Sequence, residues 1–282
     1  MELIFAAALC SVLVSILLKL CKHKGFDVLQ MIAGNYAVAS MLCWLWFKPD
    51  LIHISIVGTP WWLIILLGII LPSLFLGLAK SLQISGILKT EIAQRLSVVL
   101  SLLAAYFLFS EQFNQLKIIG VVLGIAAVLC ILFSRIEITT SKTSKQGMLY
   151  LLCVWIGYAL VDILLKYTTS LGLQFAVTLN LMLISAFILS VLYLTLIKTR
   201  WQLKNIGAGF ALGVVNFANI ALYVKAHMLL KDSPAVVFAG MNILVVMFGV
   251  MAGILIFKEQ LRIAIVFSLI LGLAGVVCLA LA

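Results

Sequence analysis

Leu13–Lys19 reads LVSILLK, and Leu160–Lys166 reads LVDILLK. Six of the seven letters are the same, although the two stretches lie 147 positions apart. The one difference is Ser15 in the first stretch and Asp162 in the second. The match predicts a chain built from two related halves. The mismatch places a carboxylate within an apolar segment of only one half.

The composition requires a membrane. Apolar residues make up 65% of the 282 residues and charged residues only 10%, against roughly 25% charged residues in soluble domains. A water-soluble fold cannot hide so much apolar surface. We therefore predict an all-α polytopic membrane protein. No part of the chain is long enough outside the apolar segments to form a nucleic-acid-binding domain. Segments of about 20 apolar residues can span a bilayer, and ten are expected at residues 2–20, 28–47, 60–80, 88–109, 115–134, 147–166, 173–197, 203–226, 234–256 and 262–281.

The repeat extends beyond the opening stretch. Lys80 corresponds to Lys225 at a separation of 145 positions, and residues 109–112 (FSEQ) correspond to residues 257–260 (FKEQ) at 148. Matches of charged residues at nearly one separation do not arise from apolar composition alone. The chain is therefore divided into three parts: a first five-helix repeat at 1–134, a polar linker at 135–146 and a second five-helix repeat at 147–282.

Each half has an odd number of segments, so the two halves are expected to enter the membrane in opposite orientations, as inverted repeats. The basic residues agree with this expectation. The loops after the odd-numbered segments, with their flanking helix ends, hold all but five of the 19 Lys and Arg residues; the five are Lys48, Lys117, Lys166, Lys225 and Lys231. The positive-inside rule then places these loops in the cytoplasm and both termini on the other side.

Small residues and prolines predict how the helices pack. Gly120xxxGly124, Gly209xxxGly213 and Gly249xxxGly253 form faces that let helices approach closely. Core packing is one interpretation of these faces, and a dimer interface is the other. Pro72 is expected to kink or unwind the third segment, whereas Pro234 is expected to open the ninth.

Two sequence blocks carry a resemblance to a known family. They are SEQFNQLKIIGVVLGIAAVL at Ser110–Leu129 and KEQLRIAIVFSLILGLAGVV at Lys258–Val277. Each has a Glu in a loop, followed by a glycine-rich helix. With the segment count, this pattern resembles the drug/metabolite transporter superfamily, specifically its ten-helix members with two EamA-like repeats. The resemblance implies a transporter of small metabolites with a central cavity between the halves. Paired basic residues deep in the late helices, typical of sugar-phosphate or nucleotide-sugar carriers, are not found.

The sixth segment carries a stripe that its repeat partner lacks. Trp155, Tyr158 and Asp162 fall on one helix face, whereas the first segment has small residues, including Ser15, at the matching positions. Aromatic rings with a carboxylate suit a cationic or zwitterionic amine. These three residues are therefore candidates for substrate binding. The alternative is that Asp162 pairs with Lys166 one turn further on and serves only the structure.

A second stripe occurs in the eighth segment, where Asn216, Asn219 and Tyr223 replace the leucines of the third segment. Polar side chains that face lipid are unfavourable, so this stripe should face the interior. The stripe has two alternative roles, which are hydrogen bonding to the substrate and hydrogen bonding between helices. Asn180 and Asn242 are added to the substrate-binding candidates. Asn180 corresponds to Asn35 at a separation of 145 positions, so a structural role for that pair is the alternative.

The last candidate site residues are charged residues of the fourth segment. Two further glutamates lie in the loops after the fourth and ninth segments. Glu91 and Arg95 lie one helical turn apart, within reach of an ion pair. They are candidates for gating or coupling, for binding a substrate carboxylate at Arg95, or for a structural ion pair. Glu111 and Glu259 occur in both halves, so we expect them to be loop or capping residues.

The residues together favour a secondary active or facilitative transporter working by alternating access. Its expected partners are a small amine-bearing substrate, such as an amino acid or quaternary ammonium compound, membrane lipid, and protons or another coupling ion. We expect no metal, no cofactor and no enzymatic activity, with a monomer or homodimer in the bacterial inner (cell) membrane. The alternatives are a transporter of an amphipathic or lipid-linked substrate, a membrane-embedded enzyme acting on lipid headgroups, and a non-transporting subunit.

Overall fold

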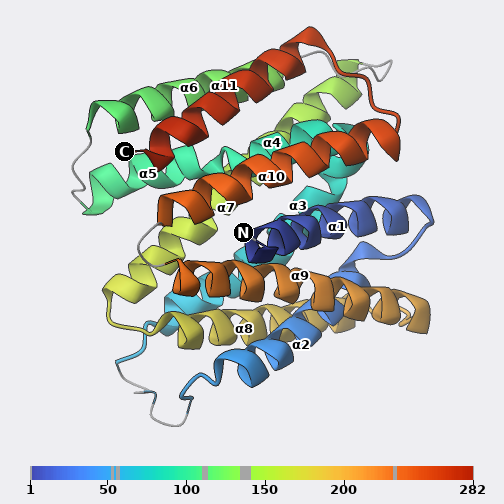
Figure 1. The fold of residues 1–282 in the computed structure, drawn as a ribbon. Helices are drawn as coiled ribbons and strands as arrows, with labels where there is room; N and C mark the ends of the chain where they lie inside the picture. Colours follow the sequence, from blue (N-terminus) through green and yellow to red (C-terminus); the bar gives the residue numbers. More distant parts are fainter. Residues whose placement is uncertain are drawn as a thin grey trace.

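The computed structural model describes residues 2–51, 54, 58–109, 114–133, 141–230 and 234–281. The regular structure in these ranges is α-helical (Figure 1). The helices are α1 (Glu2–His23), α2 (Val28–Phe47), α3 (Trp61–Ile84), α4 (Ile87–Arg95), α5 (Ser97–Phe109), α6 (Gln115–Phe133), α7 (Ser141–Ser170), α8 (Phe175–Leu196), α9 (Leu203–Leu229), α10 (Pro234–Leu255) and α11 (Ile263–Ala280).

Within the described ranges, ten helical stretches are long and apolar enough to cross a bilayer, which confirms the ten predicted spans. Nine of them are single helices. The fourth, Ile87–Leu108, consists of α4 and α5 in succession. The chain is therefore an all-helical integral membrane protein.

The interruption of the fourth span at Leu96 differs from the continuous helix predicted at 88–109. Leu96 has φ −77° and ψ −2°, which is off the helical value of ψ. Its carbonyl accepts a hydrogen bond from the indole Nε1 of Trp155 at 3.0 Å, and the Ser97 hydroxyl donates to the Gln94 carbonyl at 2.7 Å. The Leu96 carbonyl also accepts the backbone N–H of Val99 at 3.1 Å, so side-chain donors and a tighter backbone turn share the carbonyls at the interruption.

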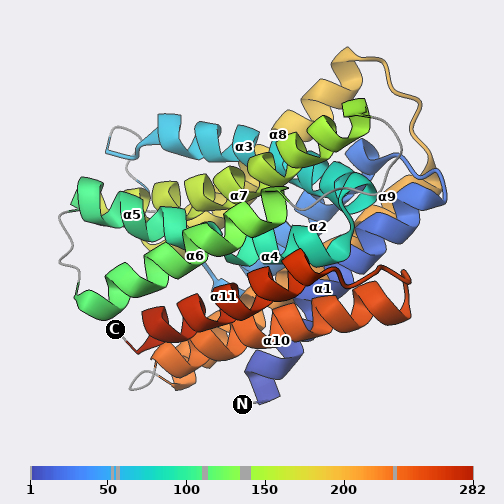
Figure 2. The same cartoon turned by 90° about the horizontal axis from the view of Figure 1, so that it is seen from above.

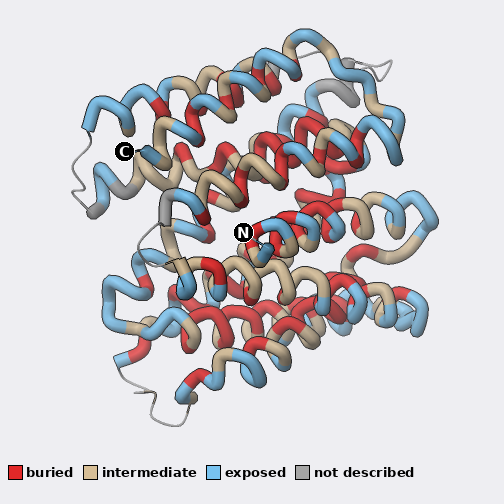
Figure 3. The backbone as a smooth tube through the Cα atoms, in the orientation of Figure 1, coloured by how far each residue is buried: buried red, intermediate tan, exposed pale blue. Residues whose placement is uncertain are grey.

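Two outer sets of helices enclose a central set. In Figure 1 the pair α6 and α11 lies along the upper edge, and α2, α8 and α9 lie along the lower edge; the view from above shows α11 beside α6 (Figure 2). Between them stand α1, α3, α4, α7 and α10. Buried positions concentrate where these helices face one another, and exposed positions follow the outer surfaces (Figure 3).

Glycines permit the closest helix crossings. A Cβ added at Gly209 would lie 2.5 Å from the Met31 carbonyl oxygen, and one at Gly213 would lie 2.7 Å from that of Asn35. The helices α2 and α9 are therefore in backbone contact, and a side chain at either glycine would force them apart. Core packing, one of the two predicted roles, is confirmed for this face.

The two prolines behave differently from each other. The helix α3 runs uninterrupted through Pro72, so this residue does not unwind the third span as one of the predicted alternatives required. Pro234 is the first residue of α10, as predicted. A proline there is tolerated because the first N–H of a helix has no partner within the helix.

Candidate functional site

A cavity of about 410 Å³ lies at the centre of the helices. Its walls come from α1, α2, α3, α4, α5, α7, α8, α9 and α10, so eight of the ten spans contribute. None of its described lining residues belongs to α6 or α11. The volume falls within the range of small-molecule sites in proteins, about 300–1,000 Å³.

Most of the predicted site residues meet in this cavity, although they come from four helices and are far apart in the sequence. The predicted residues that line it are Arg95, Tyr158, Asp162, Asn216, Asn219, Tyr223 and Asn242. Three others lie outside its lining: Glu91, Trp155 and Asn180.

Asp162 provides a carboxylate to the cavity from α7. Its side chain has solvent-accessible surface, and its Oδ2 accepts a hydrogen bond from Ser101 of α5 at 3.3 Å. Tyr158, one turn earlier on α7, lines the same wall. An anionic oxygen and an aromatic ring on one helix face are suited to an organic cation.

Arg95 provides the opposite charge from the last turn of α4, where the fourth span is interrupted. Its Nη2 donates to the Ser11 hydroxyl of α1 at 2.5 Å, and its buried Nε has no hydrogen-bond partner. In the described part of the chain, no ion pair within 4.0 Å joins it to Glu91. The structural ion pair that the spacing allowed is thus replaced by contacts to α1.

Glu91 is buried between α1 and α10, one turn away from the cavity wall. It is only 1% exposed and accepts a hydrogen bond from the Ser15 hydroxyl. Its Oε2 has no hydrogen-bond partner. A Cβ added at Gly249 of α10 would lie 3.0 Å from the Glu91 Cγ, so the glycine makes room for the acid.

The predicted amides divide between structural contacts and the cavity. Asn216 lines the cavity and donates to Asn35 of α2 at 3.2 Å, and Asn242 donates to the Phe238 carbonyl at 2.8 Å. Asn219 lines the cavity with a buried Oδ1 that has no partner. Asn180 instead donates to the Ser40 carbonyl at 2.9 Å, which ties α8 to α2.

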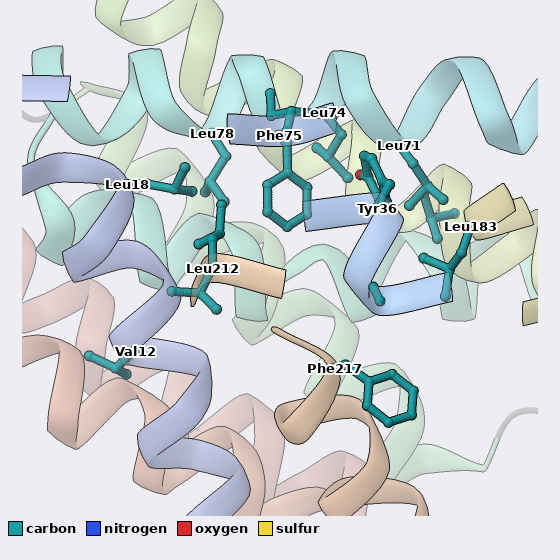
Figure 4. Close-up of a cluster of buried hydrophobic side chains, with 14 of the residues drawn as sticks. Val12, Leu18, Tyr36, Leu71, Leu74, Phe75, Leu78, Leu183, Leu212 and Phe217 are labelled. Atoms are coloured by element: carbon teal, nitrogen blue, oxygen red, sulfur yellow. The ribbon is translucent and has the colours of Figure 1, made fainter. Parts of the chain in front are cut away.

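Tyr36 was not among the sequence candidates, yet it lines the cavity from α2. It is 1% exposed, its hydroxyl has no hydrogen-bond partner, and its ring packs edge-on against Phe75 with centroids 5.8 Å apart (Figure 4). Ser11 and Gln94 are further polar lining residues outside the predicted set of site residues. A signal for Tyr36 was available, because it stands beside Asn35 in an otherwise apolar segment.

One turn beyond the cavity, a charged cluster joins α1, α4 and the α10–α11 connection. Lys19 forms an ion pair with Glu259 and lies 4.1 Å from the centroid of the Phe257 ring. The Glu259 carboxylate also accepts the backbone N–H groups of Ile87 at 2.7 Å and Leu88 at 3.1 Å. Glu259 therefore caps the start of α4, as predicted for a capping residue. Its repeat partner Glu111 lies outside the described residues.

The cavity has the chemistry to bind a small polar organic molecule. It offers an acid, a guanidinium, four amides and three tyrosines among apolar side chains. In the described ranges, no group of three or more His, Cys, Asp and Glu residues is placed to hold a metal ion.

Two comparisons with known proteins found sequences similar to this chain. A family model described as "EamA-like transporter family" matches residues 2–133. An uncharacterized protein of Haemophilus influenzae (strain KW20 / Rd) is 37% identical over 285 residues, which cover 99% of this chain and 97% of the relative. The similarity to the relative thus runs along essentially the whole chain.

Proposed function

Because the chain belongs to the EamA-like transporter family of the drug/metabolite transporter superfamily, we propose that it transports a small amine-bearing metabolite across the membrane. Transport is secondary active or facilitative. The observation that carries the proposal is the presence of Asp162 and Arg95 in one cavity. A zwitterion such as an amino acid presents an ammonium group and a carboxylate, and each finds its opposite charge there.

The remaining lining residues fit the same substrate. Tyr158 and Tyr223 offer ring faces to an ammonium group. Asn219 has a free buried acceptor, which leaves a hydrogen bond for a ligand to complete. Leucines such as Leu71 and Leu78 line another part of the wall and accommodate an apolar side chain of the substrate. A long apolar group would fit the alternative, amphipathic substrate.

Alternating access requires two halves that move against each other, and we propose the inverted repeats 1–134 and 147–282 for this role. Several helix contacts support the pairing. The packing of α1 on α9 and α10 corresponds to the packing of α7 on α3 and α4, and that of α2 on α9 corresponds to that of α8 on α3. The family model also matches a length close to that of the first half alone.

Polar contacts join α1 to α4 and to the α10–α11 connection beside the cavity, and we propose that they close one end of it. Three polar contacts occur at successive turns of α1, and we call them the α1 ladder: Ser11 with Arg95, Ser15 with Glu91, and Lys19 with Glu259. The α1 ladder lies toward the end of the molecule where the α1–α2, α8–α9 and α10–α11 connections gather (Figure 1). We propose that it separates during transport, which opens this end.

The basic loops at that end indicate the orientation. Lys22, Lys24, Lys198, Arg200 and Lys258 lie in or next to these connections. By the positive-inside rule, we propose that the α1 ladder lies at the cytoplasmic side of a bacterial inner membrane, with both termini on the other side.

The test is uptake by purified protein in liposomes. Vesicles preloaded with an unlabelled candidate are diluted into the same labelled compound, with and without a proton gradient, across a panel of amino acids, their decarboxylated amines and quaternary ammonium compounds. We expect saturable exchange of at least one zwitterion or amine. The absence of protein-dependent flux for the whole panel would refute the proposal.

A further inference from the structure

A second hollow lies on the outside of the helices, between α2, α3 and α8. Its volume is about 510 Å³, and it shares no lining residue with the central cavity. We call it the outer groove. Its walls include Ile32 of α2, Pro72 of α3 and Leu189 of α8.

The outer groove opens toward the lipid and not toward the central cavity. Ile69, Leu192 and Leu196 line it and are 50%, 51% and 71% exposed. All three belong to stretches that cross the membrane. Apolar side chains exposed there face hydrocarbon, so the natural occupant of the groove is an acyl chain.

The length of the outer groove fits one leaflet. Along α8 it runs from Leu189 to Leu196, which is about 10 Å at the helical rise of about 1.5 Å per residue. It begins near Leu29 at the start of α2 and reaches Gly68 of α3, one turn beyond Pro72 in the middle of that helix. Half of a bilayer core is about 15 Å thick. The groove therefore runs from one membrane surface toward the midplane.

The end of the outer groove at the membrane surface is basic. Lys198 and Arg200 come two and four residues after Leu196, the last groove residue of α8, and both are exposed. Two cations at the surface end of an acyl-chain groove lie at the depth of a lipid phosphate.

The basic connection between α8 and α9 is also held in place. Gln30 is 2% exposed and stands next to the groove residue Leu29. Its Nε2 donates to the Arg200 carbonyl at 3.1 Å, and its Oε1 accepts the backbone N–H of Gln202 at 2.9 Å. Its Nε2 also donates to Asp27 at 3.0 Å. A buried amide thus fixes the backbone that carries the two cations, so the site is preorganised.

The geometry points to a binding site for one anionic phospholipid, with an acyl chain in the outer groove and the phosphate on Lys198 and Arg200. The lipid would contact α2 and α3 on one side and α8 on the other. Because these helices lie before and after the polar linker, the bound lipid bridges the two parts of the chain.

Native mass spectrometry of the purified protein tests this site. The protein is titrated with palmitoyl-oleoyl phosphatidylglycerol and, separately, with phosphatidylcholine that has the same acyl chains. We expect one phosphatidylglycerol to bind about tenfold or more tightly than phosphatidylcholine. Equal binding of the two lipids would overturn the proposal.

A charge-reversal pair locates the headgroup. Lys198→Glu with Arg200→Glu should remove the preference for phosphatidylglycerol. The matched control is Lys258→Glu with Lys145→Glu, which makes the same charge change. Lys258 belongs to a different connection and shares a positive φ of 52° with Lys198. The control should keep the preference, and loss of the preference in both pairs would indicate a general charge effect and contradict the site.

A groove-filling variant locates the acyl chain. Ser73 is exposed and lines the outer groove, so Ser73→Trp should weaken the binding of both lipids. Thr195→Trp adds the same bulk at an exposed position on α8 outside the groove lining and should leave binding unchanged. If Ser73→Trp bound phosphatidylglycerol as tightly as the unmodified protein, the acyl chain would not lie in the outer groove, which would contradict the proposal. Thermal unfolding of each variant shows that it is folded before it is titrated.

Discussion

The Ser15 hydroxyl of α1 donates a hydrogen bond to the buried Glu91 carboxylate of α4. Ser15 is the residue that the internal repeat aligns with Asp162. The same repeat position thus has a different role in each half. In α1 it joins two helices next to the cavity, and in α7 it presents a carboxylate to the cavity itself. The difference between the halves gives the cavity its acid and the α1 ladder its central contact.

Replacement of Asp162 by Asn should remove the charge that binds an ammonium group and keep the side-chain size. A charge-assisted contact contributes about 1.5–3 kcal/mol, so we expect uptake at limiting substrate to fall about 10- to 100-fold. Glu2→Gln is the control, since it also removes one negative charge, from an exposed position at the start of α1. Equal uptake by the Asp162→Asn protein and the control would return Asp162 to a structural role.

Arg95 can be tested with paired substrates. Arg95→Gln should weaken transport of a zwitterionic amino acid about tenfold, because its carboxylate loses the cationic partner. The decarboxylated amine of the same amino acid lacks that group and should be affected much less. Competition of each compound against labelled substrate measures the two affinities. An equal loss for both compounds would mean that Arg95 acts on the fold or on the gate and not on the substrate carboxylate.

The sequence was sufficient to predict the ten spans, because a helix that spans the membrane requires only a continuous apolar segment of sufficient length. The internal repeat then provided a control for which polar residues belong to one half, and it found Asp162, Asn219 and Arg95, which line one cavity. A helical stripe, however, gives the direction of a side chain and not the depth of the cavity. Trp155 shares the face of Asp162 but bonds the Leu96 carbonyl instead.

The interruption of the fourth span could not be predicted from the sequence for a related reason. It is accompanied by a hydrogen bond between Trp155 and Leu96, which lie 59 positions apart. Nothing in the local sequence around Leu96 resembles a helix stop, since neither Gly nor Pro follows it. Tyr36 was not predicted because the candidates came from polar stripes that differ between the halves, and a single residue on α2 forms no stripe.

Loss of the Ser15 hydroxyl should destabilise the protein. Ser15→Ala would leave a buried carboxylate without its one hydrogen-bond donor, at a cost of about 1–3 kcal/mol in the free energy of unfolding. Ser40→Ala is the control, because the Ser40 hydroxyl bonds only a carbonyl of its own helix. Denaturant titration in detergent micelles measures both. A loss in Ser15→Ala no larger than in Ser40→Ala would contradict the structural importance of the contact.

Glu91 is the candidate for coupling transport to protons. Glu91→Gln fixes the neutral form of the side chain and retains its size. If Glu91 takes up and releases the coupling proton, the variant should still exchange substrate across the membrane but should no longer concentrate it when a proton gradient is applied. Exchange and gradient-driven uptake are measured in the same liposomes. Gradient-driven accumulation equal to that of the unmodified protein would exclude Glu91 as the proton carrier.

Tyr36 offers a test in which stability and transport move in opposite directions. Its hydroxyl is buried without a hydrogen-bond partner, so Tyr36→Phe should leave the free energy of unfolding unchanged or raise it by about 1 kcal/mol. If the hydroxyl bonds the substrate, the same variant should bind that substrate about tenfold more weakly. Phe75→Leu serves as the comparison, because it removes the ring that packs against Tyr36 and should lower stability. A Tyr36→Phe protein with unchanged stability and unchanged transport would mean that the hydroxyl faces the cavity without touching the substrate.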